Sequence, residues 1–280
     1  MTMNLINSAI VLQVEQSEIK AVVDRMTAIK EREGNPEGIE ILKFNNTVAC
    51  YSKTMPWPQF NTVKGLTEQD LEHLDEIIAF YEDKNRKVQF ELVPSASVPV
   101  VFEALSKRGF AQSGFHTSLY RTLPLSEADL GQCAFFQGRQ PERELVVRPL
   151  KPHEIEEYAA IHCYGSGLGE SGIIPVAANN KVLLGRAGWH FFMGLIDGEP
   201  AGVGVQYIQD GISNLTFAAT LTEHRGLGIQ QALIHRRLQE AVSQGCHLAV
   251  SQAAYLSPSH RNMQRMGMSI AYTRATWIRQ

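Results

Sequence analysis

Residues 220–231 of the chain read TLTEHRGLGIQQ, and this stretch guides the interpretation of the rest of the sequence. It follows a β-rich run, Gly226 and Gly228 mark a turn, and a helical pattern begins at Ile229. Backbone N–H groups at a helix N-terminus have no intrahelical partner, and the helix dipole adds about half a positive charge there. The glycines let the main chain approach an anion closely, and Arg225 adds a cation. The stretch therefore predicts a phosphate-binding turn, with a plain glycine-rich turn before a surface helix as the alternative.

The elements around this turn predict a mixed α/β domain over residues 144–280. Before the turn, the pairs Asp197-Gly198 and Asp210-Gly211 separate three β-rich runs and favour hairpins, because both residues can take positive φ. After the turn, apolar side chains at helical spacing lead to Gly245, a residue typical of a helix end. The expected elements are a strand at 144–149, a helix at 153–165, a glycine-rich stretch, strands at 189–196, 201–208 and 213–221, a helix at 229–245, a strand at 246–254, a helix at 257–267 and a strand at 268–278.

The N-terminal half repeats the end of this plan. From Thr67 to Leu123 it shows a helix, a strand, a helix and a strand, and both halves place a Gly-hydrophobic pair before a strand with an aromatic residue and an arginine. This similarity favours an internal duplication, while the recurrence of such elements in any α/β protein is the alternative. We therefore expect two tandem domains, residues 1–125 and 144–280, joined by a linker at 126–143.

The turn also carries a family resemblance. The segment Arg225-Gly226-Leu227-Gly228-Ile229-Gln230 resembles the R-x-x-G-x-G/A pyrophosphate loop of the GNAT acetyltransferase superfamily. Residues 261–268 resemble the family's last helix, which ends in a Gly-Phe pair before the final strands. The resemblance covers residues 144–280, and the N-terminal half looks like a second, degraded copy. It implies an α/β fold with a mixed α+β sheet, built from two tandem GNAT-like acyl-CoA N-acyltransferase domains.

By that resemblance, coenzyme A would bind where the strand before the loop ends. Ala218, Ala219 and Thr220 would face the acyl and pantetheine groups, and the loop would hold the pyrophosphate. The implied phosphate-binding residues are Arg225, Gly226, Leu227, Gly228, Ile229, Gln230 and Gln231. The acceptor would enter from the opposite side, lined by residues from Gly165 to Ile174.

Three positions depart from the family pattern. Gln230 stands where the family has Gly or Ala, so its side chain is expected to point away from the phosphates or to bond to one. Met263 stands where many members carry a tyrosine that protonates the leaving thiolate, and a methionine has no proton to donate. Leu256 stands where an asparagine commonly contacts the cofactor.

Two other side chains are candidate proton donors for the departing thiolate. His260 lies one helical turn before Met263 on nearly the same face, and Tyr272 lies in the strand after Gly267-Met268. Each also has a structural interpretation, His260 as a solvated or capping residue and Tyr272 as core packing. No single residue stands out as the base that would accept the proton of the amine.

Composition argues against several other classes of protein. Lys and Arg number 26 against 29 Asp and Glu, without long blocks of one sign, so nucleic acid is not an expected partner. The four cysteines lack metal-ligand spacing, which predicts no metal site and a reduced compartment. No apolar run reaches the length of about 18 residues that spans a bilayer, and the start lacks a signal-peptide pattern. We therefore expect a cytoplasmic protein without a membrane partner, either a monomer or a homodimer.

These observations together predict an N-acetyltransferase that moves the acetyl group of acetyl-CoA to an amine of a small molecule by direct attack. The acceptor itself is not identified. Two alternatives stay open. The chain could be a non-catalytic module that senses acyl-CoA or interacts with proteins on the same fold, or it could transfer a longer acyl chain, which a larger pocket near Ala218 to Thr220 would admit.

Overall fold

The two Asp-Gly pairs form the hairpin turns expected of them. In the computed structural model, which describes residues 6–95, 98–124 and 143–279, Asp197 and Gly198 have φ angles of 52° and 85°, and Asp210 and Gly211 have 53° and 71°. Positive φ at both central residues matches the right-handed twist of the flanking strands. The turns join three antiparallel strands, β7 (Trp189–Ile196), β8 (Glu199–Gln209) and β9 (Ile212–Thr220).

The chain divides into two compact units. The first comprises Met1–Ser118 and Ile270–Gln280, and the second comprises Leu119–Ser269. The final strand, β11 (Ser269–Arg279), therefore belongs almost wholly to the first unit, although it follows the second along the chain. Of the expected linker at 126–143, only Arg143 lies within the described residues. The assignment of 1–125 and 144–280 as two copies of one domain stays a prediction.

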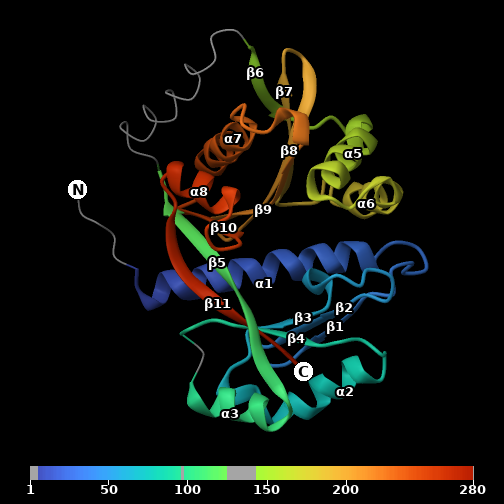
Figure 1. The fold of residues 1–280 in the computed structure, drawn as a ribbon, viewed down its shortest axis with the longest axis vertical. Helices are drawn as coiled ribbons and strands as arrows, with labels where there is room; N and C mark the ends of the chain where they lie inside the picture. The colour runs from blue at the N-terminus through green and yellow to red at the C-terminus, as the bar shows by residue number, and fades with distance from the viewer. Residues whose placement is uncertain (1–5, 96–97, 125–142, 280) are drawn as a thin grey trace. The chain divides into compact units, whose positions relative to one another are not determined.

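The second unit is a mixed sheet with helices on both faces. Its strands lie in the order β10-β9-β8-β7-β6, with β10 parallel to β9 and the others antiparallel. Helix α7 covers one face, and α5 and α6 cover the other (Figure 1). The helix α6 stands in the stretch that the sequence left without a predicted element. The further elements are β6 (Leu145–Pro149), α5 (Ile155–Ser166), α6 (Ile173–Lys181), α7 (Ile229–Ser243), β10 (Leu248–Ala253) and α8 (Pro258–Arg265), with short 3-10 turns at Pro152–Glu154, Glu170–Gly172 and Thr222–His224.

Helix α7 is held against the sheet by one apolar face and ends as the sequence predicts. Leu233 and Leu238 are buried on that face, where each side chain contributes roughly 1.5–3 kcal/mol. Gly202 of β8 lets the helix approach, since a Cβ there would lie 2.5 Å from Ile229 Cγ2. Gly245, with φ of 72°, follows the last turn and terminates the helix.

The first unit is also a mixed sheet covered on both faces. Its strands lie in the order β1-β2-β3-β4-β11-β5, with α1 along one face and α2 and α3 along the other (Figure 1). The helical run expected from Thr67 begins there as a 3-10 turn and continues as α2. The elements are α1 (Ser8–Lys30), β1 (Glu40–Lys43), β2 (Val48–Tyr51), a 3-10 turn (Pro58–Phe60), β3 (Thr62–Lys64), a 3-10 turn (Glu68–His73), α2 (Leu74–Glu82), β4 (Gln89–Leu92), α3 (Pro99–Lys107) and β5 (Phe110–Thr122).

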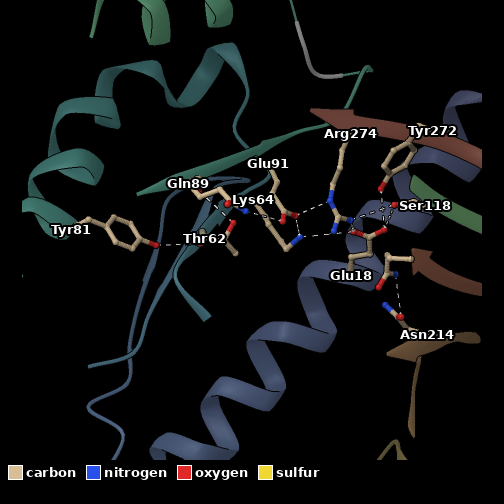
Figure 2. A network of polar contacts seen from close by, with 11 residues as sticks. Glu18, Thr62, Lys64, Tyr81, Gln89, Glu91, Ser118, Asn214, Tyr272 and Arg274 are labelled. Atoms are coloured by element: carbon tan, nitrogen blue, oxygen red, sulfur yellow. Dashed lines mark hydrogen bonds and ion pairs between the residues drawn. The ribbon is translucent and has the colours of Figure 1, made fainter. Parts of the chain in front are cut away.

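A buried polar network joins α1 to the sheet of the first unit (Figure 2). Arg274 of β11 is paired with Glu18 of α1, and its Nε lies 2.9 Å from Oε2 of Glu91 on β4. Lys64 of β3 pairs with the same Glu91, and the Ser118 hydroxyl donates to Glu18 at 2.5 Å. Burial alone would raise the pKa of Glu91, but Lys64 and Arg274 outweigh it and lower that pKa to about 2. The carboxylate of Glu91 is thus kept ionised by the cations of Lys64 and Arg274.

Glu15 lies one turn before Glu18 on α1, and its pKa shifts in the opposite direction to that of Glu91. Burial and the nearby Glu18 raise its pKa to about 7, against the opposing effect of Lys64 and Arg274. A carboxyl with a raised pKa in the folded state binds its proton more tightly than in the unfolded chain, so stability falls as pH rises from about 4.5 to 7.

We expect Glu15→Gln to stabilise the protein by up to about 3 kcal/mol at pH 8 and by little at pH 4, because a glutamine needs no proton to stay neutral. Urea unfolding of wild type and variant at both pH values measures this difference. The exposed Glu33→Gln serves as the control and should change stability at neither pH. An equal increase in the free energy of unfolding of Glu15→Gln at pH 4 and pH 8 would contradict a raised pKa of Glu15.

Candidate functional site

A cavity of about 1180 Å³ opens in the second unit where β9 ends and α7 begins. It is lined by parts of β6, the end of β9, the loop after it, the first turns of α7, and α8. The structure brings every residue of the predicted cofactor site to this one cavity. They are Ala218, Ala219, Thr220, Arg225, Gly226, Leu227, Gly228, Ile229, Gln230 and Gln231.

The cavity reaches the sheet because two parallel strands separate. β10 pairs with β9 only from Leu248 opposite Ile212 to Ser251 opposite Leu215. β9 continues beyond Leu215 as far as Thr220, and its register with β8 shifts between Val205 and Tyr207. A bulge of this kind bends a strand and ends its regular pairing. The separation leaves a notch between these two strands beyond Leu215.

The loop after β9 has the backbone geometry of an anion cradle. Gly226 and Gly228 have φ of 82° and 87°, and Gly228 is the N-cap of α7. Nothing lies within 4 Å of the position that a Cβ of Gly226 would take. Within the described part of the chain, no backbone carbonyl accepts from the N–H groups of Gly226 to Gln231. Six N–H groups at a helix N-terminus are therefore available to a phosphate.

The side chain of Gln230, where the family pattern has a small residue, points away from the cradle. Its Nε2 donates to Ser259 Oγ at 2.7 Å, and its Oε1 accepts from Asn262 Nδ2 at 2.5 Å. Asn262 Oδ1 in turn accepts from Arg265 Nη1 at 2.8 Å. The larger residue thus ties the first turn of α7 to α8, and its own N–H has no backbone acceptor among the described residues.

The cavity lining is strongly positive. It includes four arginines and one carboxylate, Glu144. Arg225 is held by a hydrogen bond from Nη2 to the carbonyl of Gly165, 3.0 Å away, and Arg236 pairs with Glu240 at 3.0 Å. The four arginines are Arg143, Arg225, Arg236 and Arg265. This charge favours a ligand with several negative groups.

The opposite face of β9 carries α5. Gly165 lets this helix approach the strand, since a Cβ there would lie 2.9 Å from Ala219 Cβ and 3.1 Å from the Thr220 carbonyl. One turn earlier, the His162 imidazole stacks on the Phe217 ring, with centroids 3.7 Å apart. The Tyr158 hydroxyl lies 3.3 Å from His162 Nδ1. Sequence analysis missed this imidazole, although His162 falls on the same helical face as Tyr158 and Ala159.

The two predicted proton donors lie elsewhere. Tyr272 belongs to the first unit, where its hydroxyl lies 3.4 Å from Glu18 Oε1, and burial and that carboxylate raise its pKa well above the usual value. His260 lies in α8 with 1% of its surface exposed, next to the ring of Tyr255. Neither contributes to the lining of the cavity. Both roles therefore stay predictions without added support.

Met263 and Leu256, two of the positions that depart from the family pattern, lie in opposite environments, one buried and the other exposed. Met263 is buried in the apolar core between α7, β10 and α8. Leu256 has a φ of 57° and 56% of its surface exposed, which is unusual for a branched apolar residue. Neither offers a proton or an amide to the cavity.

The described residues form neither a metal site nor a membrane-spanning helix. No group of three or more His, Cys, Asp or Glu is arranged to hold a metal ion within residues 6–95, 98–124 and 143–279. Among the helices found in those ranges, none combines the length and the apolar character needed to cross a membrane.

Comparison with known proteins identifies the fold. The sequence matches no protein-family model and no curated protein. The structure is similar to a GCN5-related N-acetyltransferase from Kribbella flavida, with a TM-score of 0.62 and 14% identity over 95% of this chain and 94% of that one. A GCN5-related N-acetyltransferase from Sphaerobacter thermophilus gives a TM-score of 0.58 and 13% identity, covering 93% of this chain and 92% of that one.

A tandem GNAT protein from the clavulanic acid biosynthesis pathway is also similar, with a TM-score of 0.56 and 12% identity over 94% of both chains. The chain therefore has the fold of the GNAT acetyltransferases, with matches that cover 93–95% of it, and the predicted mixed α/β class is confirmed. A protein of unknown function from Staphylococcus epidermidis shares the fold as well, with a TM-score of 0.59 and 10% identity over 87% of this chain and 94% of that one. The fold alone thus leaves the chemistry to be argued from the cavity.

Proposed function

We propose that this chain is an acyl-CoA-dependent N-acetyltransferase whose second unit moves the acetyl group of acetyl-CoA to an amine. One observation carries the proposal. The end of β9, the glycine loop and the first turn of α7 meet at a single positive cavity, and its lining includes six residues whose N–H groups have no backbone acceptor in the described part of the chain. A pyrophosphate attached to a long uncharged arm that ends in a thioester fits this combination of charge and length.

Different residues of the cavity would bind different parts of acetyl-CoA. The N–H groups from Gly226 to Gln231 would hold the pyrophosphate, with Arg225 and Arg265 as flanking cations. The strand residues Ala218 to Thr220 would line the acyl and pantetheine arm in the notch beside β10. Acetyl-CoA would supply an activated acyl group and a leaving thiolate, and because thiols are far stronger acids than alcohols or amines, a missing general acid need not abolish turnover.

We place one acyl-CoA site in each chain. In the first unit, the corresponding turn is Lys64-Gly65-Leu66, which precedes the helical run from Thr67. A Cβ at Gly65 would lie 2.2 Å from the Asn46 carbonyl, so backbone already fills the space that is open at Gly226. This closed turn supports the interpretation of the first unit as a copy without acyl-CoA.

The amine would approach from the face of β9 that carries α5 and α6. On this side, the partly exposed Phe217 and His162 border the strand where it leaves β10. On this side α5 packs closely against β9 at Gly165, where an added Cβ would lie 2.9 Å from Ala219 Cβ, and we propose a small-molecule amine as the acceptor. A residue on this face would be well placed to receive the proton that the amine loses on attack.

The experiment that tests the proposal measures transfer directly. Purified protein is incubated with acetyl-CoA alone and with members of a panel of primary amines, including an amino acid, an aliphatic polyamine and an amino sugar. Chromatography quantifies coenzyme A and the N-acetylated amine. We expect at least one amine to accelerate coenzyme A release above the hydrolysis rate and to be acetylated in equal amount.

A non-catalytic acyl-CoA sensor is the second candidate, and Met263 favours it. This buried thioether occupies the position at which many members of the family carry a proton-donating tyrosine. A sensor would bind acetyl-CoA and release no coenzyme A above background with any amine of the panel. That result would replace the enzymatic proposal with this one.

A further inference from the structure

Arg237 is a buried guanidinium without a carboxylate partner. It lies in α7 with 2% of its surface exposed, and no carboxylate pairs with it among the residues that the structure describes. Burial lowers its pKa to about 9, so the group is still a cation at neutral pH. An unpaired buried charge is costly, and such a group persists where the fold or the function requires it.

The guanidinium is held at the bulge of β9. Its Nε donates to the Leu233 carbonyl at 3.0 Å, and its Nη1 donates to the carbonyls of Val205 and Phe217 at 3.1 and 3.2 Å. Gly204 makes room for it, since a Cβ there would lie 3.2 Å from Arg237 Nε. Val205 and Phe217 are the last pair before the register between β8 and β9 shifts. Arg237 therefore satisfies carbonyls that lie at this irregularity.

The same peptide bond faces the notch. In a trans peptide the C=O and the N–H point in opposite directions. The Phe217 carbonyl points to Arg237, so the N–H of Ala218 points away from it, along the part of β9 that no longer pairs with β10. Ala218 itself lines the cavity. A cation that polarises the carbonyl of this peptide strengthens its N–H as a donor.

We propose that Arg237 is a positioning residue that sets a positive charge behind the Phe217–Ala218 peptide and thereby stabilises negative charge at the reacting end of a bound acyl thioester. The inference rests on the proposed function and goes beyond it by assigning a role to a residue outside the cavity lining. In the transfer, the amine nitrogen bonds to the acyl carbon, the carbon–sulfur bond breaks with its electron pair leaving on sulfur, and the proton that the nitrogen loses passes to water. Arg237 exchanges no proton and acts only through its charge and its hydrogen bond.

The ionisation of bound coenzyme A tests this role without relying on turnover. The ultraviolet absorbance of the thiolate is titrated in the wild-type complex, and the complex with the desulfo analogue of coenzyme A is subtracted to remove protein ionisation. We expect the pKa of the bound thiol to lie at least about 1 unit below that of free coenzyme A titrated in the same way. In Arg237→Gln, which keeps an amide donor but no charge, that pKa should return to near the free value. Arg237→Lys, which keeps the charge, should retain most of the lowering.

The outcomes separate this inference from the proposed function. Failure of wild type to bind coenzyme A would refute the acyl-CoA site itself. Binding with an unlowered thiol pKa, or with equal lowering in wild type and Arg237→Gln, would overturn the role of Arg237 and leave the site intact. If Arg237→Gln does not fold, the wild-type titration still tests the inference, since an unlowered thiol pKa overturns it, and Arg237→Lys, expected to retain most of the lowering, is the variant compared with wild type.

Discussion

Replacing Gly228 by aspartate is expected to abolish measurable binding of acetyl-CoA. Gly228 is the N-cap of α7 and has a φ of 87°, a conformation that Asp and Asn tolerate about equally. A carboxylate about 4 Å from a phosphate costs on the order of 4 kcal/mol near a protein surface, which corresponds to about three orders of magnitude in affinity. Gly228→Asn has the same size without the charge, and it should keep binding within about tenfold of wild type.

Calorimetric titration of both variants with acetyl-CoA separates the effect of the added negative charge on affinity from the effect of backbone strain at residue 228. Gly245→Asp is the matched control, because Gly245 lies after the other end of α7 with φ of 72° and nothing within 4 Å of its added Cβ. This control should bind acetyl-CoA like wild type. Equal losses in Gly228→Asp and Gly228→Asn would show that the loop does not hold an anion.

The largest stability effect is expected at Arg274. Its guanidinium faces both Glu18 and Glu91, and Arg274→Met leaves Lys64 as the remaining cation for these two carboxylates. Breaking a buried ion pair by removing one partner typically costs 3–5 kcal/mol. We therefore expect Arg274→Met to lower the free energy of unfolding by about that amount.

Urea unfolding at pH 7 measures this loss. Arg108→Met is the control, because Arg108 pairs with the exposed Asp75 on the surface of the same unit, and such exposed pairs contribute little. The control should leave the urea midpoint nearly unchanged. A similar small effect for Arg274→Met would mean that the buried network does not hold the first unit together.

The second unit could be predicted from sequence because its signals are local. The Asp-Gly pairs, the glycines of the loop and Gly245 each require a particular backbone conformation, and the structure has it at all of them. The first unit gave weaker signals. Strands of three or four residues, such as β3 (Thr62–Lys64), are too short to show an alternating pattern.

The proton donors could not be placed because sequence spacing does not report which unit a strand joins. Tyr272 follows α8 along the chain, yet β11 belongs to the first unit. The burial of Arg237, by contrast, could have been predicted from the sequence. Arg237 stands four residues after the buried Leu233 and four before the buried Ala241, so an arginine falls within an apolar stripe. Because Arg236 stands next to it, the two arginines read in the sequence as part of a solvent-exposed helix face.

The most direct test of the central claim, that the second unit holds one acyl-CoA on its glycine loop, is calorimetric titration of the wild-type chain with acetyl-CoA. We predict one equivalent bound per chain, with an affinity that weakens as salt screens the phosphates from the cavity arginines. Absence of binding would contradict the claim and leave the fold as ancestry without this chemistry. Two equivalents would contradict the single site and the closed turn at Gly65.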